Sequence, residues 1–489
     1  MSVSIVVLGG LTLVGLATVG IWLVYGRPDF QQVDAVSPGG ALDAIKVSAG
    51  LVAGVGAAVA LVVAYRKQRL GEEEHRLQEE SSQRDANRLF NERFARASDQ
   101  IGSERAAVRL AGIYAMAGLA DDWHEGRQTC IDVLCAYLRM PFAPRGPLPT
   151  FDQPEYRRPR PWEMFIGGEP VAGPNVDAAG EAQVRTTVIQ VLRDHLVSED
   201  GRSWQGAEFD FTGSVLEDAS FDGIIFSDCH VRFDDCLFVG ECGFSQTTFR
   251  RSDVSFLNAV FAGRLGFEYS KFEESDITFY GDFTEKTDAN FQGASLTSGT
   301  LRILGPRKHG GSVSFVEADF SGGVLELNPS MLHDGASIAF SRAKISGTDV
   351  RILGGEHKAG SIWCNGIDMT AGSFIFGAAE WSQWPVRLEG TEFSFDGARV
   401  SGGEIALRHV LIDGSDVHFE NFEMLDGRLN IASCEVDSGT LRFLNPVMTG
   451  GEVVMLESQR SGPLRAVTAA SQAGGARLIA AATDDISPP

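Results

Sequence analysis

The sequence predicts a mainly β protein dominated by a solenoid, and three observations support this fold class. Two apolar residues separated by one residue recur about every eleven to thirteen positions between about Phe209 and Met455. So short a repeat is typical of solenoids, because each unit buries its apolar face only against the units before and after it. A small and then a large residue recur later in each unit, and phenylalanines return at a fixed interval of 23 residues.

The residue pattern within each repeat unit predicts two short strands joined by a corner. The unit from Val313 reads V-S-F-V-E-A-D-F-S-G-G-V, in which inward and outward positions alternate and glycines close the unit. A turn takes two units, or about 23–24 residues, and about twenty-two rungs then make about eleven turns. The interval of 23 separates Phe221, Phe244 and Phe267; Phe226, Phe249 and Phe272; and Val231, Val254 and Ile277.

The repeat resembles that of the pentapeptide-repeat family. A-D-F-S-G at Ala318 to Gly322 and A-S-F-D-G at Ala219 to Gly223 match the family's alternation of small and large residues. The resemblance covers about half of the chain and implies a four-sided, right-handed β-helix. Strict pentapeptide tandems repeat every five residues, whereas this chain alternates about five with about seven. We therefore expect a wider or more irregular coil than a plain square one.

Residues 1–66 predict a hairpin of two transmembrane helices. Val3–Tyr25 contains 23 residues without a charge, enough at about 1.5 Å per residue to cross a bilayer core of about 30 Å. A secretory signal is the alternative, but no Lys or Arg precedes this run and the run is too long. Val47–Tyr65 is a second uncharged run, and the basic residues after it place the rest of the chain in the cytoplasm. We expect a multi-pass inner-membrane protein with both termini cytoplasmic.

Residues 67–140 predict a juxtamembrane helical stalk followed by a pair of helices. The stalk, Gln68 to about Ser98, is rich in Glu, Arg and Gln. Apolar residues then recur at helical spacing in Ala106–Leu119 and again in Cys130–Leu138. This block resembles a helical module found beside pentapeptide repeats in bacterial membrane proteins, so the chain as a whole resembles a membrane-anchored member of that family.

Three further segments complete the predicted organisation. Residues 141–180 read as a linker with a small basic patch at Arg157, Arg158 and Arg160. Residues 181–457 contain a capping helix and the solenoid, and the helix protects the open edge of the first turn. Residues 458–489 read as a flexible tail that contributes in part to a cap. The spacing between apolar pairs falls to seven at Val386/Leu388 and Phe393/Phe395, which predicts a missing side and a kink or bulge there.

Two other irregular segments supply the candidate site. In G-P-R-K-H-G-G-S and G-G-E-H-K-A-G-S, a lysine and a histidine stand where other units have the large inward residue. The segments start 49 residues apart, so they are expected on one side of the rod at a separation of about 10 Å. The alternative is two irregular corners with solvated charges. The candidate partner-binding residues are Arg307, Lys308, His309, His357 and Lys358.

The charge and the absence of known catalytic motifs disfavour several classes of function. The net charge is −23, and the solenoid from Glu208 to Glu457 holds 38 acidic and 18 basic residues, so non-specific nucleic-acid binding is not expected. A solvated acidic surface that keeps the rod soluble is the simplest interpretation. The zinc-protease, P-loop, serine-hydrolase and Cys-x-x-Cys signatures do not occur, so we expect no catalytic residue, metal or cofactor. The seven cysteines lack a disulfide spacing and read as packed free thiols in a reducing compartment.

These observations favour a non-enzymatic interaction or scaffold protein that is anchored in the membrane and presents an acidic cytoplasmic solenoid to a protein partner. The partner's identity and the oligomeric state are left open. One alternative is a membrane sensor-effector in bacterial stress or anti-phage defence. Another, implied by the resemblance, is a DNA-imitating topoisomerase-binding protein, which membrane tethering disfavours. An enzyme is the least favoured class, because the acidic residues form no evident cluster.

Overall fold

The computed structural model of this chain describes residues 38–144, 160–163, 178–197, 203–284, 287–304, 311–327, 335–354, 356–378, 385–455 and 473–480, with a few isolated positions before residue 38. The chain forms two compact units, Met1–Glu92 and Arg93–Pro489. Helix α2 (Pro38–Ile101) begins in the first unit and ends in the second. The other described helices and strands belong to the second unit.

Helix α2 is 64 residues long and has no break at the predicted boundary between residues 66 and 67. Side chains four residues apart are paired along its polar part, as in Arg76 with Glu80 and Arg88 with Glu92. Each such pair adds about 0.2–0.5 kcal/mol to helix stability, which favours a helix even where its side chains are exposed.

The two predicted membrane spans are not tested by the structure. Val3–Tyr25 lies almost entirely outside the described residues. Among the helical residues that are described, no segment has the length and hydropathy of a membrane span. The transmembrane hairpin therefore stays a prediction.

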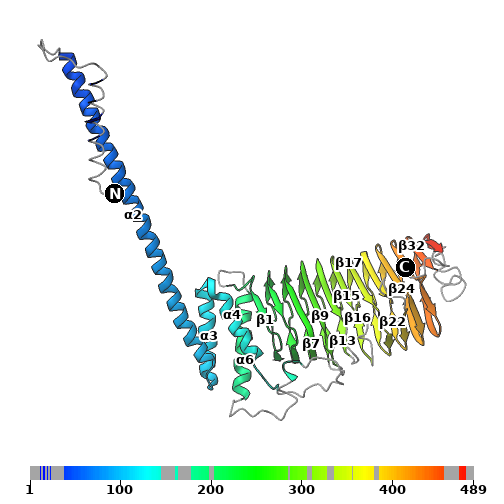
Figure 1. Cartoon of the computed structure of the whole chain (residues 1–489). Helices are drawn as coiled ribbons and strands as arrows, with labels where there is room; N and C mark the ends of the chain where they lie inside the picture. Colours follow the sequence, from blue (N-terminus) through cyan, green and yellow to red (C-terminus); the bar gives the residue numbers. More distant parts are fainter. Residues whose placement is uncertain are drawn as a thin grey trace. The chain divides into compact units, whose positions relative to one another are not determined.

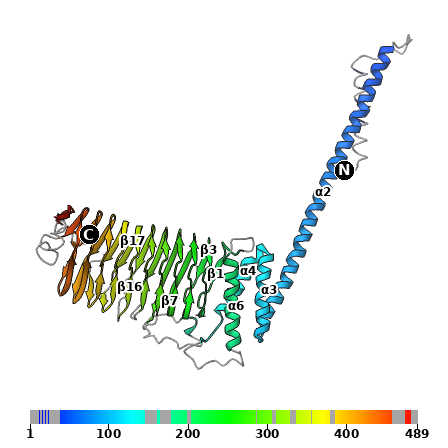
Figure 2. The same ribbon diagram turned by 180° about the vertical axis from the view of Figure 1, so that it is seen from behind.

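Four short helices form the cap of the second unit: α3 (Ala106–Asp122), the 3-10 helix η1 (His124–Gly126), α4 (Arg127–Arg139) and α6 (Ala178–Leu196). Apolar side chains of α3, α4 and α6 face one another, because apolar residues recur at helical spacing in each of them. Figures 1 and 2 show α4 and α6 beside the first strands and α3 farther away. The small helical module that the sequence predicts is therefore confirmed.

The strands stack in parallel and form a right-handed solenoid with four sides, named A to D in chain order. Side A consists of β1 (Glu208–Asp210), β4 (His230–Arg232), the first parts of β7 (Asp253–Gly266) and β9 (Ser275–Phe283), β12 (Gly299–Leu304), β15 (Val324–Leu327), the last parts of β17 (Lys344–Leu353) and β20 (Asp368–Gly377), β24 (Glu404–Arg408), β28 (Arg428–Asn430), β32 (Glu452–Met455) and β33 (Arg477–Ala480).

The other three sides are built in the same way. Side B consists of β2 (Val215–Glu217), the first part of β5 (Leu237–Gly243), later parts of β7 and β9, and the sheet of β18 (Glu356–Lys358), β21 (Val386–Glu389), β25 (Val410–Asp413) and β29 (Cys434–Val436). Side C consists of the last parts of β5 and β7, then β10 (Asp288–Asn290), β13 (Ser312–Ser314), β16 (Ser337–Ala339), β19 (Ser361–Trp363), β22 (Glu392–Ser394), β26 (Ser415–Glu420) and β30 (Gly439–Leu444). Side D consists of β3 (Ile225–Ser227), β6 (Thr248–Arg250), β8 (Lys271–Glu273), β11 (Ser295–Leu296), β14 (Asp319–Phe320), the first parts of β17 and β20, β23 (Arg399–Val400), β27 (Glu423–Met424) and β31 (Val447–Met448).

The length of a turn agrees with the sequence interval. His230 pairs with Asp253, a step of 23 residues, and Thr300 pairs with Val324, a step of 24. The predicted turn of about 23–24 residues is therefore confirmed, and the rod has about ten turns where about eleven were predicted. Strand β33 pairs with β32, so part of the predicted flexible tail is the last strand of the rod.

One turn is longer than its neighbours and corrects a prediction. Ser373 pairs with Glu404, a step of 31 residues, because extra residues separate β20 from β21. The short spacing between Leu388 and Phe393 joins β21 on side B to β22 on side C, two adjacent sides of a complete turn. The prediction that a side is missing is therefore wrong.

Phenylalanine rings stack in columns through the core, because equivalent inward positions of successive turns lie above one another. One column runs through Phe221, Phe244, Phe267, Phe291, Phe315 and Phe340, with neighbouring ring centroids 4.7–5.1 Å apart. The next position of this column is Cys364, and the column resumes at Phe395. Phe374 of side A fills the gap, with its centroid 5.5 Å from those of Phe340 and Phe395.

All seven cysteines are buried thiols that form no disulfide, as the sequence predicts. Burial raises the pKa of the Cys130 and Cys229 thiols to about 11 and that of Cys135 to about 12. A buried, protonated thiol is a poor nucleophile, so these residues serve packing.

Candidate interaction surface

The cap covers the open edge of β1 through α4. The side-chain amide of Gln128 donates to the carbonyl oxygen of Glu208 at 2.8 Å and accepts from the N–H of Glu208 at 3.0 Å. A neighbouring strand would make bonds of the same kind with β1. Arg139, at the end of α4, forms an ion pair with Asp210 at the other end of β1. The cap thus occupies an edge that would otherwise accept a strand from another molecule.

A buried polar network joins the cap helices. Glu181 of α6 accepts a hydrogen bond from the Tyr137 hydroxyl at 2.8 Å and forms an ion pair with Arg109 at 3.1 Å. Arg185 donates to carbonyl oxygens of α4 and β2, so it ties both to α6. Burial lowers the pKa of Arg185 to about 10, although the Glu181 carboxylate opposes this shift. The recess beside Arg185 has a volume of about 20 Å³, room for about one water molecule.

Residues 160–163, which we call the strap, dock on the outside of side B. The Trp162 side chain is only 5% exposed, and its indole N–H donates to the carbonyl oxygen of Asp235 at 2.8 Å. Its ring belongs to an apolar cluster with Val215, Leu237, Val239 and Val260.

Arg160 anchors the other end of the strap and is 1% exposed. Its Nε donates to the carbonyl oxygen of Asn258 at 2.8 Å, and its Nη2 lies 2.5 Å from a carboxylate oxygen of Asp282. The guanidinium carbon lies 5.6 Å from the centroid of the Trp162 ring. The structure therefore corrects part of the predicted linker, since residue 160 of the basic patch is packed against the rod. Arg157 and Arg158 lie outside the described residues.

The predicted partner-binding residues do not come together as one described site. Arg307, Lys308 and His309 lie outside the described residues. His357 occupies an inward position of β18, in register with Leu388 of β21, and has no exposed surface. Burial places His357 in the wall of the rod, out of reach of a partner, and this corrects the expectation of a projecting loop.

Lys358 is exposed on side B and takes part in a series of ion pairs. Its Nζ lies 3.7 Å from Glu389, and Arg387 lies 3.2 Å from Glu389 and 3.2 Å from Asp413. These contacts join three successive turns, β18, β21 and β25. The outer surface of side B is therefore polar at this level of the rod.

Sequence reasoning missed a group of polar residues on side C. His418 Nδ1 lies 3.0 Å from Asp396, and its Nε2 lies 3.8 Å from Glu392. Trp363, 38% exposed, stands two turns away in the same column, with Ser394 between them. Sequence separations close to one turn, such as 396 to 418, are the signal that would have found this group. Within the described parts of the chain, no group of His, Cys, Asp or Glu is arranged to hold a metal ion.

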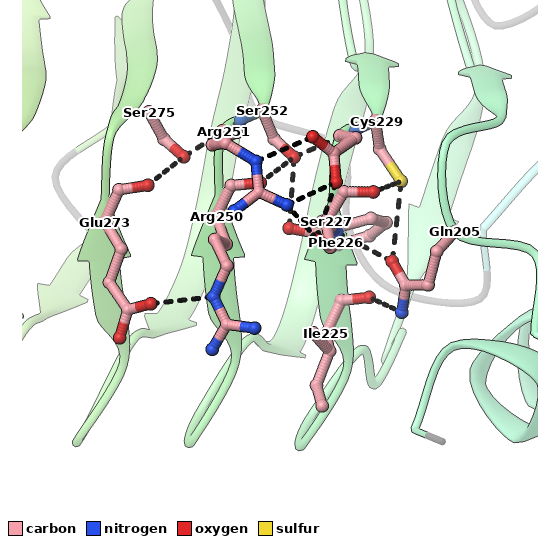
Figure 3. Close-up of polar contacts among 11 residues, drawn as sticks. Gln205, Ile225, Phe226, Ser227, Cys229, Arg250, Arg251, Ser252, Glu273 and Ser275 are labelled. Atoms are coloured by element: carbon pink, nitrogen blue, oxygen red, sulfur yellow. Dashed lines mark hydrogen bonds and ion pairs between the residues drawn. The ribbon is translucent and has the colours of Figure 1, made fainter. Parts of the chain in front are cut away.

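The corner between sides D and A shows how polar groups are satisfied along the rod (Figure 3). Arg250 pairs with Glu273 and Arg251 with Asp228, each across one turn. The Ser252 hydroxyl accepts from the Cys229 N–H, and the Ser275 hydroxyl accepts from the Ser252 N–H, each at 3.0 Å. These groups bond within the chain, so this corner holds the turns in register.

Comparison with known proteins identifies no relative. No family model, no curated protein and no solved structure matched this chain.

Proposed function

We propose that this chain is a membrane-tethered interaction scaffold that presents its solenoid to a protein partner. The strap carries this proposal, because this segment, distant in sequence from the strands it contacts, docks on the outside of side B through two buried side chains. Tryptophan and arginine are the residue types that most often dominate protein interfaces. A surface that holds both has the properties of a protein-binding face.

The solenoid supports this role through its extent and its stability. Stacked turns offer a long surface on each side, as in other repeat proteins that bind partners. The packed phenylalanine columns keep this surface in one shape, and the cap closes the edge of β1 against strand addition.

The tether rests on the N-terminal sequence. The 23 uncharged residues of Val3–Tyr25 and the run Val47–Tyr65 are each long enough to cross or nearly cross a bilayer. The sensor-effector alternative requires a second conformational state that binding favours.

The charge pattern of side D disfavours DNA imitation. Lys344, Asp368, Arg399 and Glu423 occupy equivalent positions of successive turns and alternate in sign. DNA presents a continuous row of negative phosphates, and this column does not.

Proximity labelling in intact host cells tests the proposal. A C-terminal tag is placed on the full chain, on a form lacking residues 1–66, and on a form in which an unrelated two-helix anchor replaces them. We expect a membrane-associated set of partners that the truncated form loses and the replacement anchor restores. Failure of the replacement to restore labelling would favour the sensor-effector. A soluble set shared by all forms, including a DNA topoisomerase, would overturn the tethered scaffold.

A further inference from the structure

The outward positions of side B differ between the early and the late turns. In the first three turns they form the apolar patch beneath Trp162: Val215, Leu237, Val239 and Val260. In the late turns, equivalent strands carry Arg387, Glu389 and Asp413 outward. Outward apolar residues of a soluble rod that form one patch mark a surface that is covered by another segment.

The strap contacts successive turns of the rod. The carbonyl oxygens of Asp235 and Asn258, which accept from Trp162 and Arg160, belong to corners one turn apart. Pro161 between them lies over Gly213, where a Cβ would approach the proline Cγ to 2.8 Å. The Glu163 N–H donates to the Arg160 carbonyl oxygen at 3.0 Å, so the strap is a tight turn. Its side chains contact four successive turns of the rod, at Gly213, Asp235, Asn258 and Asp282. Arginine at one end and tryptophan at the other fit two different subsites.

We propose that these two subsites are a peptide-docking site and that the strap is its intramolecular ligand, which competes with a partner segment carrying Arg-x-Trp. This inference rests on the proposed function of the chain as a scaffold. The tryptophan subsite is the apolar patch with the Asp235 carbonyl, and the arginine subsite is Asn258 with the Asp282 carboxylate. A carboxylate at the second subsite selects a cationic side chain and disfavours an acidic one.

Competition from the strap reduces the binding of a partner segment to the docking site. The strap belongs to the same chain, so its effective concentration at the peptide-docking site is in the mM range typical of short tethers. A partner segment of the same affinity binds only weakly until the strap is released. Weakening the strap is therefore expected to increase partner binding, which is the opposite of its effect on an ordinary structural contact.

The experiment uses the full chain in detergent and a fluorescent peptide of residues 157–166. The strap variant Arg160→Ala/Trp162→Ala is expected to bind this peptide at least about tenfold more tightly than the unmodified chain, because its pocket is vacant. Adding Val239→Glu, which places a charge in the apolar patch, is expected to remove this gain. A peptide with alanine at both motif positions is the matched control.

The outcome that overturns the proposal is a folded strap variant that binds the motif peptide no better than the control peptide. Circular dichroism and the unfolding midpoint show whether the variant is folded. If the double variant does not fold, Trp162→Phe serves instead, since it keeps an aromatic ring in the apolar patch and removes the indole N–H that donates to Asp235. It is expected to raise peptide affinity by a smaller factor, and no rise would also overturn the proposal.

Labelling in cells separates this inference from the proposed function. If the full chain labels specific partners but neither Val239→Glu nor the strap variant changes that set, the scaffold stands and the peptide site fails. If no specific partner is labelled by any form, the scaffold itself fails. Exchange of straps between two copies would appear as a stable dimer in light scattering and would contradict a partner as the occupant.

Discussion

Gln128 takes the place of a missing strand beside Glu208. One side-chain amide both donates to the backbone carbonyl and accepts from the backbone N–H of the same residue. Two hydrogen bonds of β1 are satisfied in this way without any extended backbone on the other side. The first turn therefore ends in helices, and it does not present a row of unpaired backbone groups.

Replacing Gln128 by alanine is expected to lower the free energy of unfolding by about 1–3 kcal/mol, because two hydrogen bonds to β1 are lost and each has a net value of about 0.5–1.5 kcal/mol. The larger effect should be on association, because the edge of β1 is then open to strands of other molecules. Light scattering and denaturant midpoints measure the two effects. Gln68→Ala is the matched control, since its amide donates to Glu72 of the same helix, on an exposed part of α2. Equal association of both variants would show that Gln128 does not protect the edge.

A second prediction concerns the exchange of volume between Cys364 and Phe374. Phe374→Ala is expected to cost about 3–5 kcal/mol, because it leaves a cavity between Phe340 and Phe395. Cys364→Phe alone is expected to cost about 1–3 kcal/mol, since Phe374 already fills the space. The double variant should recover about 0.5–3 kcal/mol relative to the sum, because the new ring completes the column. Strict additivity in denaturant unfolding would contradict this packing.

The stacking interval made the architecture predictable, and the reason is physical. Phe221, Phe244 and Phe267 had to recur at one interval because rings that stack must occupy the same place in every turn. Side B was less readable. Its strands in the late turns form a separate sheet. The 31-residue turn breaks the regular interval between apolar pairs, so the pair Val386 and Leu388 has the spacing of a missing side although its strand is paired.

The candidate site was less predictable because it depends on contacts between distant segments. Arg160 and Asp282 are 122 residues apart, and the sequence around the arginine has the composition of a linker. The repeat pattern places His357 at an inward position, but it does not show that this side chain is fully buried. The alternation of apolar and polar residues along a strand predicts which positions face inward and which face outward. It does not predict which distant segment covers an outward apolar patch.

The cap network leads to a third prediction. Glu181→Gln removes the only carboxylate that pairs with Arg109 among the described contacts and leaves two arginines buried. Loss of one partner from a buried pair costs about 3–5 kcal/mol. Tyr137→Phe removes one hydrogen bond to the same carboxylate and should cost about 1 kcal/mol, which makes it the milder comparison. Unfolding midpoints measure the loss of stability in each variant. Equal losses of stability in Glu181→Gln and Tyr137→Phe would argue against a charge effect.

The ion pair of Asp210 with Arg139 predicts how the cap responds to acid. Partial burial tends to raise the pKa of Asp210, but hydrogen bonds from Thr212 and the charges of Arg139 and Arg232 outweigh it, so the pKa lies below its ordinary value. A carboxyl with a lowered pKa contributes stability above its unfolded pKa of about 3.9 and loses it as the pH falls through the folded pKa. Asp210→Asn is therefore expected to reduce stability at neutral pH, and its difference from the unmodified chain is expected to shrink as the pH falls below about 3.9 and through the lowered pKa of Asp210. Denaturant midpoints measured from neutral to acid pH test this, and a difference between the two proteins that does not shrink in acid would contradict the role of the pair.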